Sequence, residues 1–303
     1  MIGGGTRMAF RSVNDILAQC EQEKKEFWQV IIEDDMNERD VSFAESFDKM
    51  RGLWEAMLEA TSSYEPNLTS ASGMVGREGG KMEEYRRKGD TLCGEFTTKV
   101  MMRALQMGGS NACMKRIVAA PTAGACGVLP AVLTSYYEDM QATEKEVIQA
   151  LYVAAGIGQV IATRAFIAGA AGGCQAEIGS ASAMAAAALV SLKGGTKEQM
   201  GHACAMALKN LLGLVCDPVG GLVEVPCVKR NVIGAMNALS AADMALAGIE
   251  SMIPVDQVID AMRSVGEAMD VSLRETGAGG LAATPRAKEL MEKFKMKRND
   301  LSQ

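Results

Sequence analysis

Apolar residues recur at helical spacing near the start of the chain. Between residues 12 and 38 they return every third or fourth position, and Ser12 and Asp15 occupy the places of an N-cap residue and its partner three positions on. This pattern predicts one amphipathic helix over 12–38. The same spacing predicts a second helix over 42–60.

Two later segments open with capping boxes. The sequences Thr-Glu-Lys-Glu at 143–146 and Thr-Lys-Glu-Gln at 196–199 each precede helical apolar spacing, so we expect helices to begin at both places. The most apolar region, 150–192, is interrupted by Arg164, Glu177 and repeated glycines. A membrane span needs roughly 20 consecutive apolar residues. This region is therefore interpreted as a buried helical core, and no membrane partner is expected.

Composition favours a helical fold class. Only 5% of the residues are aromatic, whereas Ala, Met, Leu, Glu and Lys are abundant. The stretch 61–90 is rich in Ser, Gly and charge and contains Pro66, which predicts a long loop. We therefore expect an all-α, multi-helix protein. Residues 1–92 would form an N-terminal helical region with a glycine-rich loop and residues 93–303 a larger domain, and the two could pack as one.

The charge of the chain limits its partners. The net charge is −6 and the sequence pI is about 5.1, with no basic stripe, so we expect no nucleic-acid partner. The segment 73–81 superficially resembles a phosphate-binding loop, but Val75 stands at the first glycine position and Met82 follows Lys81. Nucleotide binding is not expected either. Residues 1–7 contain no apolar stretch, which argues against a secretory signal and predicts a cytoplasmic protein.

Four segments of small residues separate the predicted helices. A cofactor pocket lined by helix ends would need such turns, because glycine permits positive φ and close backbone approach. Each turn taken alone is explained better as a connection between helices with a glycine C-cap. The four segments are 120–127, 172–179, 216–221 and 276–284.

The cysteines are the main candidates for metal chemistry. The chain has eight of them and one histidine, His202, and no two cysteines form a Cys-x-x-Cys pair, so zinc fingers and histidine-based metal sites are not expected. His202 shares a predicted helix face with polar residues and is interpreted as a surface residue. Any metal would have to be held by cysteines far apart in the sequence.

Position along the chain separates these cysteines into groups. Cys174, Cys216 and Cys227 lie in or beside Gly or Pro turns, and Cys126 is an equal candidate on these grounds. Spacing alone ranks core positions ahead of ligation. Two others fall within helical patterns and are predicted core residues, namely Cys20 and Cys204.

Several of these segments resemble one known family. The loop 73–81, the sequence APTAG at 120–124, GGCQAEIGSAS at 172–182, LVCDPVGGLVEVPCVKRN at 214–231 and the turn 276–284 resemble the iron–sulfur-dependent L-serine dehydratases, specifically the α chain of the two-chain bacterial form. The resemblance covers nearly the whole chain from Met8. It also suggests that residues 1–7 are an extension from an upstream start.

The resemblance implies a cofactor and a reaction. The cluster cysteines of the family fall on Cys174, Cys216 and Cys227, and Cys126 is not implied. They would hold a [4Fe-4S] cluster with one open iron acting as a Lewis acid on the serine hydroxyl. The implied activity is that of an L-serine ammonia-lyase, which forms pyruvate and ammonia from L-serine without pyridoxal phosphate, in serine catabolism and gluconeogenesis. Residues 93–303 would then be the cluster-binding catalytic domain.

The resemblance also implies a partner. Related single-chain enzymes carry their proposed basic histidines in an N-terminal domain with a Ser-Ser-His-Thr motif, which this chain lacks. A β subunit, in a heterodimer, is therefore expected to supply the catalytic base. No cysteine follows Cys227, so the open iron should be accessible to substrate and the cluster oxygen-labile.

Four polar residues in the motif loops are candidate contacts for the substrate carboxylate or for the surroundings of the cluster. Each could equally satisfy buried backbone groups. They are Lys81, Thr122, Arg230 and Asn231. Two rival functions remain open, an L-cysteine desulfidase-like iron–sulfur lyase and a non-catalytic helical scaffold.

Overall fold

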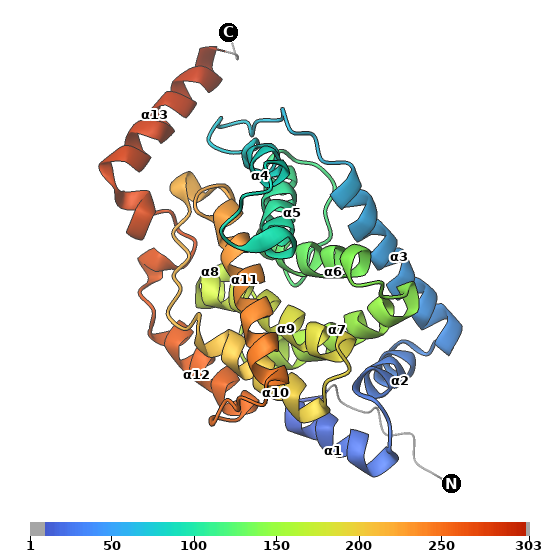
Figure 1. Cartoon of the computed structure of the whole chain (residues 1–303). Coiled ribbons are helices and arrows are strands. Elements are labelled where there is room, and N and C mark those ends of the chain that lie inside the picture. The colour runs from blue at the N-terminus through green and yellow to red at the C-terminus, as the bar shows by residue number, and fades with distance from the viewer. Residues whose placement is uncertain (1–9, 301–303) are drawn as a thin grey trace.

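The computed structural model describes residues 10–300, with side chains through residue 296. This part of the chain forms thirteen α-helices joined by turns and loops and contains no strand, so the predicted all-α fold class is confirmed (Figure 1). The proposed extension, residues 1–7, lies outside the described residues. The helices are α1 (Val13–Glu23), α2 (Phe27–Arg39), α3 (Phe43–Ser62), α4 (Glu78–Arg87), α5 (Gly94–Ala112), α6 (Val128–Asp139), α7 (Glu144–Arg164), α8 (Gly169–Gly172), α9 (Ser180–Leu192), α10 (Lys197–Lys209), α11 (Cys227–Leu246), α12 (Val255–Ala268) and α13 (Pro285–Asp300).

Helix α9 forms the centre of the core. Its residues from Ser180 to Val190 are all buried, and it contacts α6, α7, α10 and α11 (Figure 1). Its many alanines allow neighbouring helices to approach closely. Among the described helices, α7 alone is long and apolar enough to cross a membrane, but 61% of its apolar window is buried inside the fold. The prediction of a buried helical core over 150–192 is therefore confirmed.

The prediction of one helix over 12–38 is wrong. The chain turns sharply at Lys24, whose φ of 53° and ψ of 44° are left-handed, and a second helix starts three residues later. Glu26 and Gln29 form a capping box there, since each side chain accepts a hydrogen bond from the other residue's backbone N–H. Lys25 pairs with two glutamates across the turn. The apolar spacing continues through this break because α1 and α2 bury their faces in the same core.

The prediction of a loop over 61–90 is wrong in its second half, which contains α4. Glu78 lies in its first turn and Arg86 in its last, and both complement the helix dipole. The glycines at the start of α4 serve close contact, because a Cβ at Gly79 would lie 2.5 Å from the side chain of Gln106.

The other helix predictions are confirmed. Helix α3 covers the predicted stretch 42–60. At the start of α7 the Glu146 N–H donates to Thr143 Oγ1 at 3.3 Å, and the Thr143 N–H donates to Glu146 Oε2 at 2.7 Å. The same reciprocal pair joins Thr196 and Gln199 at the start of α10.

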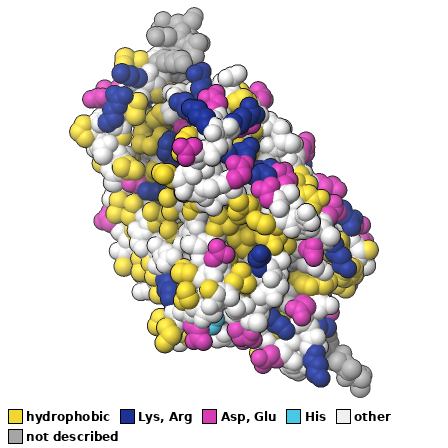
Figure 2. Space-filling model, viewed as in Figure 1, with side chains coloured by type: hydrophobic (Ala, Val, Ile, Leu, Met, Phe, Trp, Pro, Cys, Tyr) yellow, Lys and Arg dark blue, Asp and Glu magenta, His cyan; other side chains and the backbone are white. Residues whose placement is uncertain are grey.

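The two predicted regions share one buried apolar cluster. It includes Phe10 in the first region and Met262 in the second. The boundary between 1–92 and 93–303 stays a prediction. On the face that Figure 2 shows, Lys and Arg side chains are interspersed with Asp and Glu.

Candidate functional site

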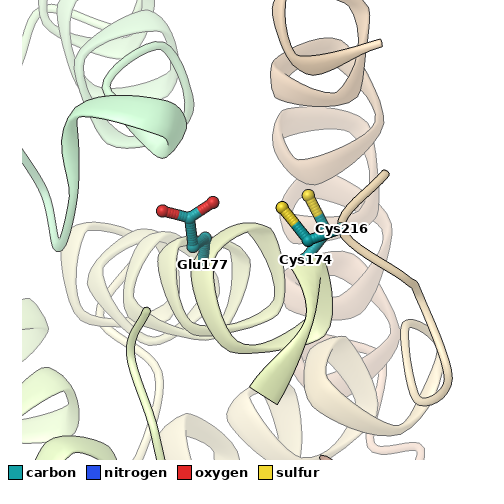
Figure 3. A group of neighbouring side chains, drawn as sticks. All are labelled: Cys174, Glu177 and Cys216. Atoms are coloured by element: carbon teal, nitrogen blue, oxygen red, sulfur yellow. The ribbon is translucent and has the colours of Figure 1, made fainter. Parts of the chain in front are cut away.

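Two cysteines and a glutamate converge where two separate turns meet. Cys174 precedes a π-helical turn, η2 (Gln175–Gly179), which carries Glu177 and leads into α9. Cys216 comes from the separate segment after α10. One sulfur or oxygen atom from each of these side chains lies within 4.8 Å of the others (Figure 3). Both cysteines are 2% exposed. Folding therefore brings together two of the glycine-rich turns that the sequence singled out.

A tight backbone turn positions Cys174. Gly173 has a φ of 78°, and a Cβ there would lie 2.6 Å from the side chain of Met269, so glycine is required. The buried amide of Gln175 donates to the Met262 carbonyl at 3.0 Å. Its backbone N–H donates to the Leu214 carbonyl at 2.9 Å. Single π turns inside helices are frequent at functional sites.

A short backbone bridge positions Cys216. Its N–H donates to the Leu273 carbonyl at 2.8 Å, and its carbonyl accepts from the Glu275 N–H at 2.7 Å. The next residue, Asp217, accepts from the Leu281 N–H at 2.8 Å. These bonds fix the turn 276–284 against the cysteine segment.

Cys227 begins α11 and is also buried, at 6% exposed. It is not part of the group within 4.8 Å. Burial raises the pKa of its thiol to about 12, and the negative charge of Cys174 adds to this shift. The third predicted cysteine therefore lies close enough to Cys174 to interact with it electrostatically.

The thiols of Cys174 and Cys216 share a hydrogen bond that shifts their pKa values in opposite directions. It lowers the pKa of Cys174, since the Cys216 thiol donates to it, and the positive charge of Arg230 acts in the same direction against the effect of burial. The same bond, together with burial, raises the pKa of Cys216. Without a metal, Cys174 is therefore the first of the two to become a thiolate.

Arg230 lies beside these thiols on α11. Its guanidinium donates to the Val215 carbonyl at 2.7 Å and to Asp217 Oδ1 at 2.8 Å. Asp217 is only 3% exposed, so this ion pair is largely removed from water. The donors of Arg230 hold the Cys216 segment in place, and its predicted contact with a substrate carboxylate stays a prediction.

Glu177 was not predicted as a site residue. Thr122 donates to its Oε1 at 2.8 Å. Burial raises the pKa of the Glu177 carboxyl, and the negative charge of Glu275 adds to this. The only signal in the sequence was an acidic residue within a long run of small, apolar ones. The sequence does not identify Glu177 or Glu275 as site residues, because their closeness to the thiols depends on how the turns meet in the fold.

Glycines leave room in front of this group. A Cβ at Gly169 would lie 2.8 Å from Cys216 Sγ and 3.0 Å from Glu177 Oε2. A Cβ at Gly124 would lie 3.0 Å from the same glutamate oxygen. A side chain on either glycine would occupy the space that the thiols and the carboxylate face.

Asn231 joins another predicted turn to the site. Its amide donates to the Gly124 carbonyl at 2.9 Å and the Cys227 carbonyl at 3.0 Å, and its Oδ1 accepts from the Gly127 N–H at 2.8 Å. The structure places Lys81 elsewhere, exposed on α4 and lining a surface hollow of about 330 Å³. The roles predicted for all four polar residues stay predictions.

The other thiols have different surroundings. Cys20 and Cys204 are completely buried, which confirms their prediction as core residues. Cys126 is also buried, donates to the Met107 carbonyl at 3.7 Å, and has its pKa raised to about 12 by burial. His202 is half-buried, and its Nδ1 accepts from the Ser251 N–H at 3.3 Å.

The donor set fits a thiolate-bound metal group. Two buried thiols from separate turns converge, the buried Cys227 lies near enough to Cys174 for their charges to interact, and Arg230 favours the charged form of Cys174. Two glycines leave space beside Cys216 and Glu177. These features define a helical protein with a buried thiol and carboxylate centre.

The chain belongs to the serine dehydratase alpha chain family, whose model matches residues 22–282. It is 46% identical over 285 residues to the probable L-serine dehydratase, alpha chain, of Bacillus subtilis, covering 94% of this chain and 95% of that protein. It is 39% identical over 284 residues to the L-serine dehydratase, alpha chain, of Peptoniphilus asaccharolyticus, covering 93% and 97%. A shorter match, 44% identical over 186 residues, joins 60% of this chain to 41% of the longer L-serine dehydratase 2 of Escherichia coli. The predicted family is therefore confirmed.

Proposed function

We propose that this chain is the α subunit of an iron–sulfur-dependent L-serine dehydratase, a lyase that converts L-serine to pyruvate and ammonia together with a β subunit. The observation that carries the proposal is the buried convergence of Cys174, Cys216 and Glu177 beside Cys227. The family supports the reaction, and the "alpha chain" in its relatives' names supports the partner. A cytoplasmic heterodimer is part of the proposal.

The three predicted cysteines would hold the metal group. Cys174, Cys216 and Cys227 supply three thiolates for a [4Fe-4S] cluster. When bound, this group supplies a Lewis-acidic iron that lowers the cost of expelling the serine hydroxyl. Arg230 favours the charged form of Cys174 and so assists ligation.

The protein around the thiols excludes water and fixes geometry. Thr122 donates a hydrogen bond to Glu177, whose carboxylate points to the same side of its helix as the two thiols (Figure 3). Asn231 joins the turn of Gly124 to the start of α11. Loss of the α-proton and the hydroxyl of L-serine gives 2-aminoacrylate, which tautomerises to an imine and hydrolyses to pyruvate and ammonia. This sequence of steps needs no pyridoxal phosphate.

The base for the α-proton is assigned to the β subunit. The single histidine, His202, accepts a backbone hydrogen bond from Ser251 and lines a hollow with residues of α10 and the 250–255 loop. None of the residues lining that hollow belongs to the thiol centre. A complete active site would therefore require the second chain.

The test measures iron and acid-labile sulfide after anaerobic purification. We expect about four irons per chain in the wild type and loss of most of them in Cys174→Ser, Cys216→Ser and Cys227→Ser. Cys93→Ser is the matched control, because this thiol is exposed. A wild-type chain without iron even after reconstitution would favour a scaffold subunit instead.

Turnover separates the two enzymatic readings. The reconstituted α and β chains together should release pyruvate from L-serine faster than sulfide from L-cysteine, and the α chain alone should release neither. A preference for L-cysteine would favour the desulfidase reading, since one atom in the leaving group distinguishes the two substrates.

A further inference from the structure

A cleft that includes none of the thiol turns lies between α2, α3 and α7, which contact one another in pairs (Figure 1). It has a volume of about 490 Å³ and shares no lining residue with the thiol centre. Each helix presents one face to it, with lining residues three, four or seven positions apart. This volume is within the range of small-molecule sites.

Asp34, on the α2 wall, is an unusual buried acid. It is only 7% exposed, yet within the described part of the chain its carboxylate has one hydrogen-bond partner, the neutral amide of Gln159, 3.3 Å from Oδ2. No cation pairs with Asp34 anywhere in residues 10–296. Burying a carboxylate is costly unless charge or several hydrogen bonds compensate it.

The neighbouring acid, Asp35, shows the contrast. Arg39 donates to its Oδ2 at 2.9 Å and Ser46 donates to the same oxygen at 2.5 Å. The Ser46 hydroxyl also lies 2.7 Å from the hydroxyl of Tyr152 on α7. This network joins all three helices and gives the cleft a fixed polar wall. Asp34 is next to it but outside it, so its charge remains available to a ligand.

The remaining lining residues define the chemistry of that ligand. Glu38 follows Asp34 by one turn of α2 and adds a second negative charge at the rim. Lys49, on α3, lines the same rim and has no acidic partner among the described residues. The larger aliphatic side chains of the wall are Ile31, Met50 and Leu53.

We propose that this cleft is a non-catalytic binding site for an α-amino acid with an apolar side chain. Asp34 and Glu38 receive the ammonium group, Lys49 faces the carboxylate, and the apolar wall contacts the side chain. The site is independent of the proposed reaction, because it uses none of the thiol residues and needs no metal.

The experiment is isothermal titration of the purified full-length chain with L-leucine, which has no β-hydroxyl group to eliminate. Saturable binding is expected for the wild type. Asp34→Asn should weaken it at least about tenfold, since truncating a buried charge pair costs that much or more. Lys49→Met should weaken it less, because its side chain is exposed. The analogue 4-methylpentanoate, which lacks the ammonium group, should not bind.

Asp48→Asn is the matched control. Asp48 is an exposed acid on α3 that pairs with Arg51 and does not line the cleft, so this variant should bind L-leucine as the wild type does. Thermal melts of all variants check that they fold. Absence of L-leucine binding to the wild type, or equal binding by Asp34→Asn, would overturn the proposal. Equal binding of 4-methylpentanoate would also overturn it.

Discussion

The guanidinium of Arg230 lies between the Asp217 carboxylate, to which it donates at 2.8 Å, and the sulfur of Cys174. Because Asp217 also accepts from the Leu281 N–H, this one pair links α11, the segment of Cys216 and the turn 276–284. The positive charge of Arg230 therefore stabilises both the buried carboxylate of Asp217 and the thiolate form of Cys174.

Removing the charge of Arg230 should therefore lower both the stability of the fold and the iron content. Arg230→Met leaves Asp217 buried and unpaired, which we expect to cost about 3–5 kcal/mol of unfolding free energy, and iron content should fall. Urea unfolding and iron analysis measure the two effects. Arg263→Met is the control, because Arg263 forms an exposed pair with Glu267 and its loss should change neither. Unchanged iron in a folded Arg230→Met protein would contradict the assigned role.

A second prediction concerns the acid side of the stability profile. Burial opposes ionisation of Glu138, but hydrogen bonds from Arg103 and Lys99 outweigh it and lower the pKa of its carboxyl below the ordinary 4.5. A carboxyl whose pKa is lower in the folded state stabilises the fold above its unfolded pKa and loses this effect as pH falls through the folded value. Arg103 is buried and donates to both oxygens of Glu138 at 2.6 Å.

Glu138→Gln should therefore be less stable than the wild type near neutral pH, and the difference should shrink as pH falls below about 4.5. Urea midpoints measured across that range test it. Glu289→Gln, in an exposed pair with Arg286, should show much less change. A constant difference at every pH would mean that the ion pair is not the cause.

Helices were predictable from the sequence wherever the signal was local. The capping boxes at Thr143 and Thr196 act within four residues, so the starts of α7 and α10 follow directly from the sequence. The break at Lys24 was missed, because both helices beside it face one core and the apolar spacing continues. Helix α4 was missed because Gly79 usually marks a helix break, whereas here close contact with Gln106 requires it.

The site was predictable only in part, because motifs are local in the sequence whereas contacts between turns are not. The motifs pointed to Cys174 and Cys216, and folding does bring these two together. Glu177 acquires its importance only from tertiary contacts with Thr122 and the thiols. Asp34 was also missed, since its lack of a cation depends on which side chains α3 and α7 present to the cleft.

Iron removal should loosen the turns around the thiols. A ligand that binds only the folded state raises stability by mass action, so anaerobic protein treated with a chelator should melt at a lower temperature than the loaded form. Limited proteolysis should then cut faster within 213–221 and 276–284. The Cys174→Ser variant provides the control, because a chelator should change its melting temperature little. Identical melting of loaded and stripped wild type would argue that the metal does not join these turns.

The last prediction concerns the space in front of the thiols. In Gly169→Ala the new methyl group would lie 2.8 Å from Cys216 Sγ and 3.0 Å from Glu177 Oε2, which is closer than real Cβ atoms normally approach other atoms. It would occupy the space in which the proposed metal group would sit, so iron binding should fall severely. Overpacking typically costs about 1–3 kcal/mol, so the protein should still fold.

Gly52→Ala is the matched control, since nothing lies within 4 Å of the added Cβ. Because Gly52 lies in the middle of α3, this substitution should stabilise the protein by up to about 1 kcal/mol. Iron content and thermal melts of the two variants distinguish the outcomes, because a full complement of iron in Gly169→Ala would show that the metal does not occupy this space.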